Sequence, residues 1–243
     1  MSALVEVRTA NLGNRAHNVT RRQQQRRLGM LTAGLPHAVA LQELVPGLKP
    51  PRGYRLTRQG EEGLLTPLRL KLRGEGYSIA HKGLAHHWPH RPIIWATVEV
   101  PGVRGLVSFV STHMNSHIDR AGLPRDPKSE GTRLALDHIE QTREVCSWLG
   151  TLGPVLCSGD WNVDAEDDGR QLDPAFPVRQ LGKAGLVDGW LLPAADDVKA
   201  TTLGVRNVDR TFGPRGAKLD ELRVRSRVTG WDHRAVSTTW RLP

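Results

Sequence analysis

The sequence predicts an α/β (α+β) protein in which two β-sheets pack together and helices lie outside them. Short apolar runs with strand-like alternation recur along the 243 residues, whereas only two segments have clear helical spacing. A doubly wound parallel sheet would need more crossover helices than two. No linker-like composition, repeat or low-complexity tract divides the chain, so we expect residues 1–243 to form a single domain.

The first half of the chain combines one helix with several strands. The helix is indicated by Leu28, Leu31 and Leu35, which recur at helical spacing, with Gly34 near its end. The Pro-, Gly- and Arg-rich segment 46–76 is expected to be an irregular connection. In chain order we predict a strand at 4–9, a helix at 20–35, a strand at 38–43, the irregular connection with a short strand near 68–72, and paired strands at 77–80 and 93–100.

The second half contains the other helix, at 132–149, between two buried strands. Ala135, Ile139, Cys146 and Leu149 fall on one face of this helix, and Gly150 marks its end. The remaining predicted elements are strands at 105–110 and 155–158, a strand or helix end at 186–190, and strands at 217–224 and 235–240.

The charge balance favours a polyanionic partner. The chain has 34 Lys and Arg against 25 Asp and Glu, a net charge of +9, and Arg is much the commoner base. Because Arg pairs with phosphate through two hydrogen bonds, nucleic acid is the expected partner. Arg21, Arg22 and Arg26 at the start of the first helix are candidates for phosphate contacts; the alternative for them is a solvated helix face.

Cysteine usage and hydropathy suggest an intracellular protein. Cys146 and Cys157 fall in a predicted helix and a predicted strand and do not form a disulfide framework. The chain as given shows neither a signal peptide nor an apolar run of 18 residues. We therefore expect a cytoplasmic protein with no membrane span, and no feature points to an obligate protein partner.

Polar side chains stand at the ends of most predicted strands. Asp160 and Asn162 follow the strand at 155–158 two positions apart, so an extended chain points them the same way. An Asx turn is the alternative for this pair. The full set at strand ends is Asn11, Glu43, His113, Asp160, Asn162, Asp232 and His233, with Asp220 one strand earlier.

This set contains the parts that phosphoester hydrolysis requires. Its oxygen donors suit Mg²⁺ or Mn²⁺, and no thiolate cluster calls for zinc. Two histidines could act as base and acid, and Asp220 could orient one of them. Asn115, two residues after His113, is a further candidate for substrate contacts. The sequence itself offers no evident acidic partner for His113.

The same residues, in the same order, resemble the endonuclease/exonuclease/phosphatase superfamily, which has the DNase I-like fold. The resemblance spans the whole chain and rests on Asn11, Ala40-Leu41-Gln42-Glu43, Ser111-Thr112-His113, Gly159-Asp160-Trp161-Asn162, Leu219-Asp220 and Asp232-His233-Arg234. It implies a four-layered αββα sandwich of two mixed sheets with a divalent-metal site at one edge. Trp231 and Ala10 depart from the residues usual at those positions.

The resemblance also implies roles for individual residues. Glu43 would be the principal metal ligand with support from Asn11, and Asp232 would bind metal or water. Asp160 and Asn162 would hold the nucleophilic water, the phosphate or a second metal. His233, oriented by Asp220, would be the general base or stabilise the phosphate, and His113 would be the acid.

Three functions compete at this point. The leading one is a Mg²⁺-dependent phosphodiesterase acting on nucleic acid, an endonuclease. The second is a phosphatase or phosphodiesterase acting on a phospholipid headgroup or an inositol phosphate, favoured by the lack of a basic groove interleaved with aromatic residues. The third is a catalytically silent binding module with the same fold.

Overall fold

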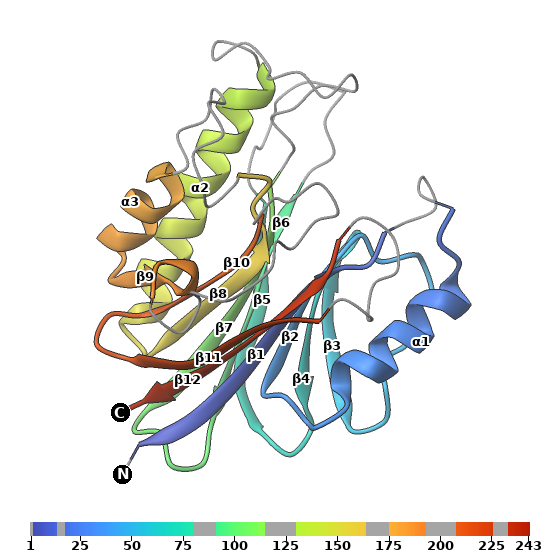
Figure 1. Cartoon of the computed structure of the whole chain (residues 1–243), viewed down its shortest axis with the longest axis horizontal. Coiled ribbons are helices and arrows are strands. Elements are labelled where there is room, and N and C mark those ends of the chain that lie inside the picture. Colours follow the sequence, from blue (N-terminus) through green and yellow to red (C-terminus); the bar gives the residue numbers. More distant parts are fainter. Residues whose placement is uncertain are drawn as a thin grey trace.

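Two six-stranded sheets pack face to face, with helices on both outer faces (Figure 1). This arrangement confirms the predicted αββα sandwich. The computed structural model describes residues 2–13, 18–79, 91–114, 130–163, 175–192, 208–225 and 233–243, and for 130–132 and 175 it describes only the backbone.

The first sheet has the strand order β11-β12-β1-β2-β4-β3 and is mixed. Its only parallel pair among the described strands is β1 with β2; the other neighbours are antiparallel. The strands are β1 (Ala3–Asn11), β2 (Ala38–Gln42), β3 (Tyr54–Gln59), β4 (Glu62–Pro67), β11 (Lys218–Arg225) and β12 (Ala235–Leu242).

The second sheet has the order β5-β6-β7-β8-β10-β9 and is mixed in the same way. Here β7 and β8 run parallel, and β10 is antiparallel to β8 on its other side. The strands are β5 (Lys71–Ile79), β6 (Pro92–Glu99), β7 (Leu106–His113), β8 (Val155–Asp160), β9 (Leu186–Asp188) and β10 (Asp209–Pro214).

Helix α1 covers the first sheet, and helices α2 and α3 cover the second (Figure 1). Thr20 caps α1: its hydroxyl accepts a hydrogen bond from Gln23 N, and the Gln23 side chain accepts one from Thr20 N. No helix in the described ranges is long and apolar enough to cross a membrane. The helices are α1 (Arg21–Thr32), α2 (Glu130–Gly150) and α3 (Ala175–Lys183), with a short 3-10 turn, η2 (Gly189–Leu191).

Three apolar layers hold the sandwich together. The central layer lies between the sheets and includes Val7, Phe109 and Trp240. Leu28 and Leu31 of α1 fill the layer outside the first sheet, and residues of α2 and α3 fill the layer outside the second sheet. Burial of this apolar surface fixes the two sheets against each other.

The segment 46–76, predicted to be an irregular connection, contains strands β3, β4 and the start of β5. The prediction is wrong because β3 is an edge strand with partly exposed polar side chains, so it lacks an apolar alternation.

Strand β10 and helix α3 were also missed. Arg210, Gly213 and Pro214 give β10 a low strand propensity. Cys146 and Cys157 are both free and buried, as expected.

Gly213 lets Trp240 pack flat against β10. A Cβ added at Gly213 would lie 2.6 Å from ring carbons of Trp240, which is fully buried. We expect Gly213→Ala to lower the free energy of unfolding by about 1–3 kcal/mol through overpacking. The control, Gly29→Ala on exposed α1, has no atom within 4 Å and should raise it by about 0.5–1 kcal/mol. Urea unfolding measures both, and an unchanged stability for Gly213→Ala would contradict this packing.

Candidate active site

Strands β7, β8 and β10 bring three titratable side chains together at one end of the strands of the second sheet. Asp160, the last residue of β8, is opposite His113, the last residue of parallel β7. It is also opposite Asp209, the first residue of antiparallel β10. The start of β10 lies beside the ends of β7 and β8 because β10 runs antiparallel to β8, whereas β7 and β8 run parallel.

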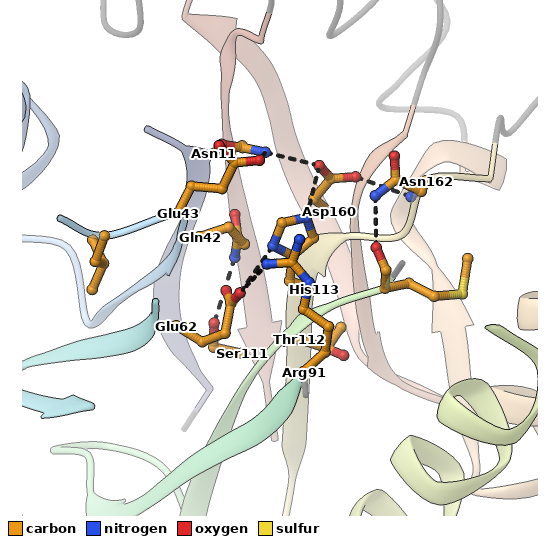
Figure 2. Close-up of polar contacts among 12 residues, drawn as sticks. Asn11, Gln42, Glu43, Glu62, Arg91, Ser111, Thr112, His113, Asp160 and Asn162 are labelled. Carbon is orange, nitrogen blue, oxygen red and sulfur yellow. Dashed lines mark hydrogen bonds and ion pairs between the residues drawn. The ribbon is translucent and has the colours of Figure 1, made fainter. Parts of the chain in front are cut away.

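The first sheet contributes Asn11, at the end of β1, and Glu43, directly after β2. Asn11 Nδ2 donates to Glu43 Oε1 and to Asp160 Oδ2, both at 3.1 Å (Figure 2). Gly13 N donates to Asn11 Oδ1 at 3.0 Å, which fixes the orientation of the amide. Asn11 therefore holds two buried carboxylates from different sheets next to each other.

Two imidazoles flank Asp160, and each has its own carboxylate partner. His113 Nδ1 is 3.0 Å from Glu62 Oε1, and its Nε2 is 3.6 Å from Asp160 Oδ2. His233 Nδ1 is 2.9 Å from Asp209 Oδ2, and its Nε2 is 3.7 Å from Asp160 Oδ2. Since a carboxylate accepts the Nδ1 proton of each ring, the Nε2 atoms are the ones left to exchange protons beside Asp160.

Glu62 is itself held in place. It lies at the start of β4, is 1% exposed, and accepts a second hydrogen bond on Oε1 from Arg91 Nη1 at 2.8 Å (Figure 2). The guanidinium compensates part of the cost of burying the Glu62 charge. The result is a chain of contacts from Arg91 through Glu62 and His113 to Asp160.

The environment of Asp160 stabilises its ionised form. Burial by itself raises the pKa of this carboxyl, but the neighbouring His233 and His113 and the hydrogen bonds from Asn11 and Asn162 outweigh burial. The pKa of Asp160 therefore lies below its ordinary value. The site keeps a buried negative charge between two imidazoles.

Two residues of the site have left-handed backbones, which non-glycine residues rarely adopt. Glu43 has φ +59° and Asn162 has φ +50°. Asn162 N donates to Asp160 Oδ1 at 2.9 Å, and its side chain donates to Met114 O at 2.7 Å. The Asx turn weighed as the alternative is thus present, and it orients Asp160. Backbone strain of this kind gathers at functional sites.

The donor set fits a hard divalent cation. The Asn11 amide nitrogen brings Glu43 and Asp160 carboxylate oxygens together, an arrangement that like-charge repulsion opposes unless a cation is nearby. Ligand atoms of Asp160, Asp209 and His233 also lie within 4.8 Å of one another. Carboxylate oxygens predominate, which suits Mg²⁺ or Mn²⁺ better than zinc.

Solved structures with the same fold cover nearly the whole chain. An endonuclease/exonuclease/phosphatase family protein from Bacteroides thetaiotaomicron is 15% identical, with a TM-score of 0.71 over 100% of this chain and 99% of that one. A mannosyl-6-phosphatase from the same organism is 15% identical, with a TM-score of 0.70 over 97% and 99%. D. rerio TDP2, complexed with a single strand DNA product, is 16% identical, with a TM-score of 0.68 over 98% and 99%. No protein-family model and no curated protein match the sequence.

The chain has the endonuclease/exonuclease/phosphatase fold. The predicted resemblance is confirmed at the level of this DNase I-like architecture.

Within the endonuclease/exonuclease/phosphatase fold, most of the predicted site residues come together. The structure gathers Asn11, Glu43, His113, Asp160, Asn162 and His233 at one end of the sandwich. Asn115 and Asp232 lie outside the described residues. Arg21, Arg22 and Arg26 are exposed on α1.

Asp220 does not orient His233, which corrects the prediction. It sits in the bulge of β11, between Leu219 and Glu221, and its carboxylate pairs with Arg241 and, at 3.6 Å, with Lys218. Asp209 takes the orienting position instead.

Sequence reasoning missed Glu62 and Asp209, the carboxylate partners of the two histidines. Both are the first residues of antiparallel strands, whereas the prediction from the sequence was built on residues that end strands. The signal available for Asp209 is an acidic residue just before the buried run Arg210-Thr211-Phe212, on a strand that pairs with β8.

Asn11→Ala tests the hydrogen bond that lowers the pKa of Asp160. Because that pKa is lower in the folded protein than in the unfolded chain, ionised Asp160 stabilises the fold above about pH 4. This contribution is lost as the pH falls through the folded-state pKa. The variant has a higher folded-state pKa, so we expect its free energy of unfolding to fall less steeply with acidification than that of the wild type.

Urea unfolding between pH 5 and pH 2.5 gives the two slopes. Asn162→Ala is the control, because the backbone N–H that donates to Asp160 remains; it should lose stability equally at every pH. A wild-type slope in Asn11→Ala would contradict the role of Asn11 in holding Asp160 ionised.

Proposed function

We propose that this protein is a divalent-metal-dependent phosphodiesterase that cleaves nucleic acid. The observation that carries the proposal is the placement of two carboxylate-bound imidazoles on either side of Asp160, with Glu43 beside it. Hydrolysis of a phosphodiester needs a base for the attacking water and an acid for the leaving oxygen. Two imidazoles whose Nε2 atoms both lie within 4 Å of Asp160 Oδ2 supply both.

The chain's own residues divide the proton transfers between them. His233, held by Asp209, accepts a proton from the attacking water at Nε2. His113, held by Glu62, donates a proton from Nε2 to the leaving oxygen. Asp160 stabilises positive charge on both rings, since its carboxylate lies within 4 Å of each Nε2. Asn162 keeps Asp160 in this position.

The metal would be Mg²⁺ or Mn²⁺, held by Glu43 with Asp160, with Asp232 as a further proposed ligand. When bound, it would neutralise charge that develops on the phosphoryl oxygens. Asn11 meets the two carboxylates through its amide nitrogen, which is not a metal donor, so we assign it the task of orienting them.

Charge favours a nucleic acid substrate. The net charge of +9 attracts a polyphosphate, and the exposed Arg21, Arg22 and Arg26 on α1 are proposed to contact its backbone. The similar structure of D. rerio TDP2 with a single strand DNA product supports the same substrate class. Asn115 is proposed to contact substrate near His113.

A small phosphomonoester is the second candidate substrate. The similarity to a mannosyl-6-phosphatase, which covers 97% of this chain, favours it. The same residues would act on either substrate, because the reacting phosphoryl group is common to both.

Cleavage of supercoiled plasmid by the purified protein, with Mg²⁺, Mn²⁺ or EDTA, tests the nuclease proposal. We expect metal-dependent nicking that Glu43→Ala abolishes and that Glu61→Ala, a neighbouring exposed carboxylate, retains. Sugar phosphates and single-stranded DNA and RNA are assayed in parallel. Turnover of sugar phosphate alone would replace the nuclease with the second candidate, and no turnover of any phosphoester by folded protein would favour a silent binding module.

The exchange of roles between Asp209 and Asp220 gives a direct comparison. Asp209→Asn removes the carboxylate that holds His233 and should lower kcat by about 100-fold or more. Asp220→Asn weakens contacts to Arg241 and Lys218, which are remote from the imidazoles in the described part of the chain, and should keep kcat within about twofold of the wild type. Steady-state hydrolysis with matched metal measures both, and the reverse ranking would refute this assignment.

A further inference from the structure

Gln24 of α1 reaches through the core to the backbone of both loops that carry the proposed metal site. The residue is fully buried. Its Nε2 donates to Glu43 O at 2.7 Å and to Gly13 O, and its Oε1 accepts from Val45 N at 2.9 Å. One side chain thus connects the loop after β1 with the loop after β2.

These partners leave only one orientation for the Gln24 amide. Two carbonyl oxygens require the NH₂ group, and a backbone N–H requires the oxygen. All of these hydrogen bonds are buried, so losing them would leave unpaired polar groups in the core. The contact set is therefore specific to glutamine: a methionine of similar size would make none of these hydrogen bonds.

The hydrogen bonds of Gln24 hold the backbone at and just after Glu43, and the backbone of Glu43 is strained. The carbonyl of Glu43 and the N–H of Val45, two residues later, are both bound by the same amide. Glu43 has φ +59°, a conformation that a non-glycine residue keeps only when its surroundings enforce it. Without the Gln24 amide, the Glu43 backbone would relax and its carboxylate would move away from Asp160.

Gln24 also acts on Asn11 through Gly13. Gln24 binds the carbonyl of Gly13, while the N–H of Gly13 binds Asn11 Oδ1 at 3.0 Å. That bond directs Asn11 Nδ2 toward the carboxylates of Glu43 and Asp160. One buried amide therefore supports both residues that the first sheet brings to the site.

We infer that Gln24 is a positioning residue for metal binding: it holds Glu43 and Asn11 in the geometry that a divalent cation requires. The inference deepens the proposed function and rests on its metal site. Residues behind metal ligands typically change metal affinity by about 10–100-fold when they are replaced. Gln24 acts through the backbone and touches neither substrate nor metal.

Mn²⁺ binding, measured by isothermal titration calorimetry, tests this role without an activity assay. Gln24→Met should raise the Kd for Mn²⁺ by about 10-fold or more. Gln25→Met is the matched control, because Gln25 is the next residue of α1 and its amide donates to Lys49 O, away from the metal site. Its Kd should equal that of the wild type. Glu43→Gln lacks the proposed ligand carboxylate, so the binding heat that it loses is the heat of Mn²⁺ binding at this site.

Excess Mn²⁺ should return Gln24→Met to wild-type kcat, because a positioning defect lowers occupancy and leaves His113 and His233 intact. Stability in EDTA shows whether the variant is folded. If Gln24→Met does not fold, Gln24→Glu keeps the acceptor for Val45 N and loses the donor to Glu43 O, and the same loss of affinity is expected.

An unchanged Kd in a folded Gln24 variant would overturn the positioning role and leave the hydrolase proposal intact. Absence of Glu43-dependent Mn²⁺ binding in the wild type would overturn both. The third outcome is a wild-type protein that binds Mn²⁺ but turns over no phosphoester, with weaker Mn²⁺ binding in the Gln24 variant. This outcome would support the positioning role and reject the hydrolase.

Discussion

The buried carboxylate of Asp160 links the two sheets through polar contacts. It receives an amide hydrogen bond from Asn11 of the first sheet. It also lies within 4 Å of His113, which ends β7 of the second sheet, and of His233, which precedes β12 of the first. A charge that is 1% exposed is tolerated only with such compensation. The relative placement of the sheets is therefore a condition for the site, and the site in turn ties them together.

The packing between the sheets changes character along the strands. Over most of their length the facing side chains are apolar, as Val7, Phe109 and Trp240 show. Toward the site, polar groups replace them: Gln42 Nε2 lies 3.5 Å from Ser111 Oγ across the interface. The apolar layer supplies the stability that allows one end of the sandwich to hold buried charges.

The sequence predicted the residues that end strands better than those that begin them. Asp160 and His113 were recognisable because each follows a buried apolar run, and polar residues at such positions are unusual. Glu62 and Asp209 were not, because their importance comes from antiparallel pairing between strands that are distant in the sequence. Pairing of this kind depends on tertiary contacts, which local patterns do not encode.

Asp220 is a second case in which local sequence did not predict a tertiary contact. Its place in a strand shortly before His233 suggested a partner for that histidine, but a bulge in β11 directs its carboxylate to Arg241. Helix α1 is a related case, since its spacing predicts a helix but not which polar side chains point inward. The inward side chains include Gln24 and also Arg27, which donates to Leu12 O at 2.6 Å.

The most direct test of the account is hydrolysis of bis(p-nitrophenyl) phosphate, a diester without nucleic acid features, in the presence of Mn²⁺. Wild-type protein should hydrolyse it, and Asp160→Asn should lose about 100-fold or more of that rate while remaining folded. Asp137→Asn, an exposed carboxylate on α2, should retain the full rate. Equal rates for wild type and Asp160→Asn would contradict the claim that the chemistry depends on the carboxylate between the two imidazoles.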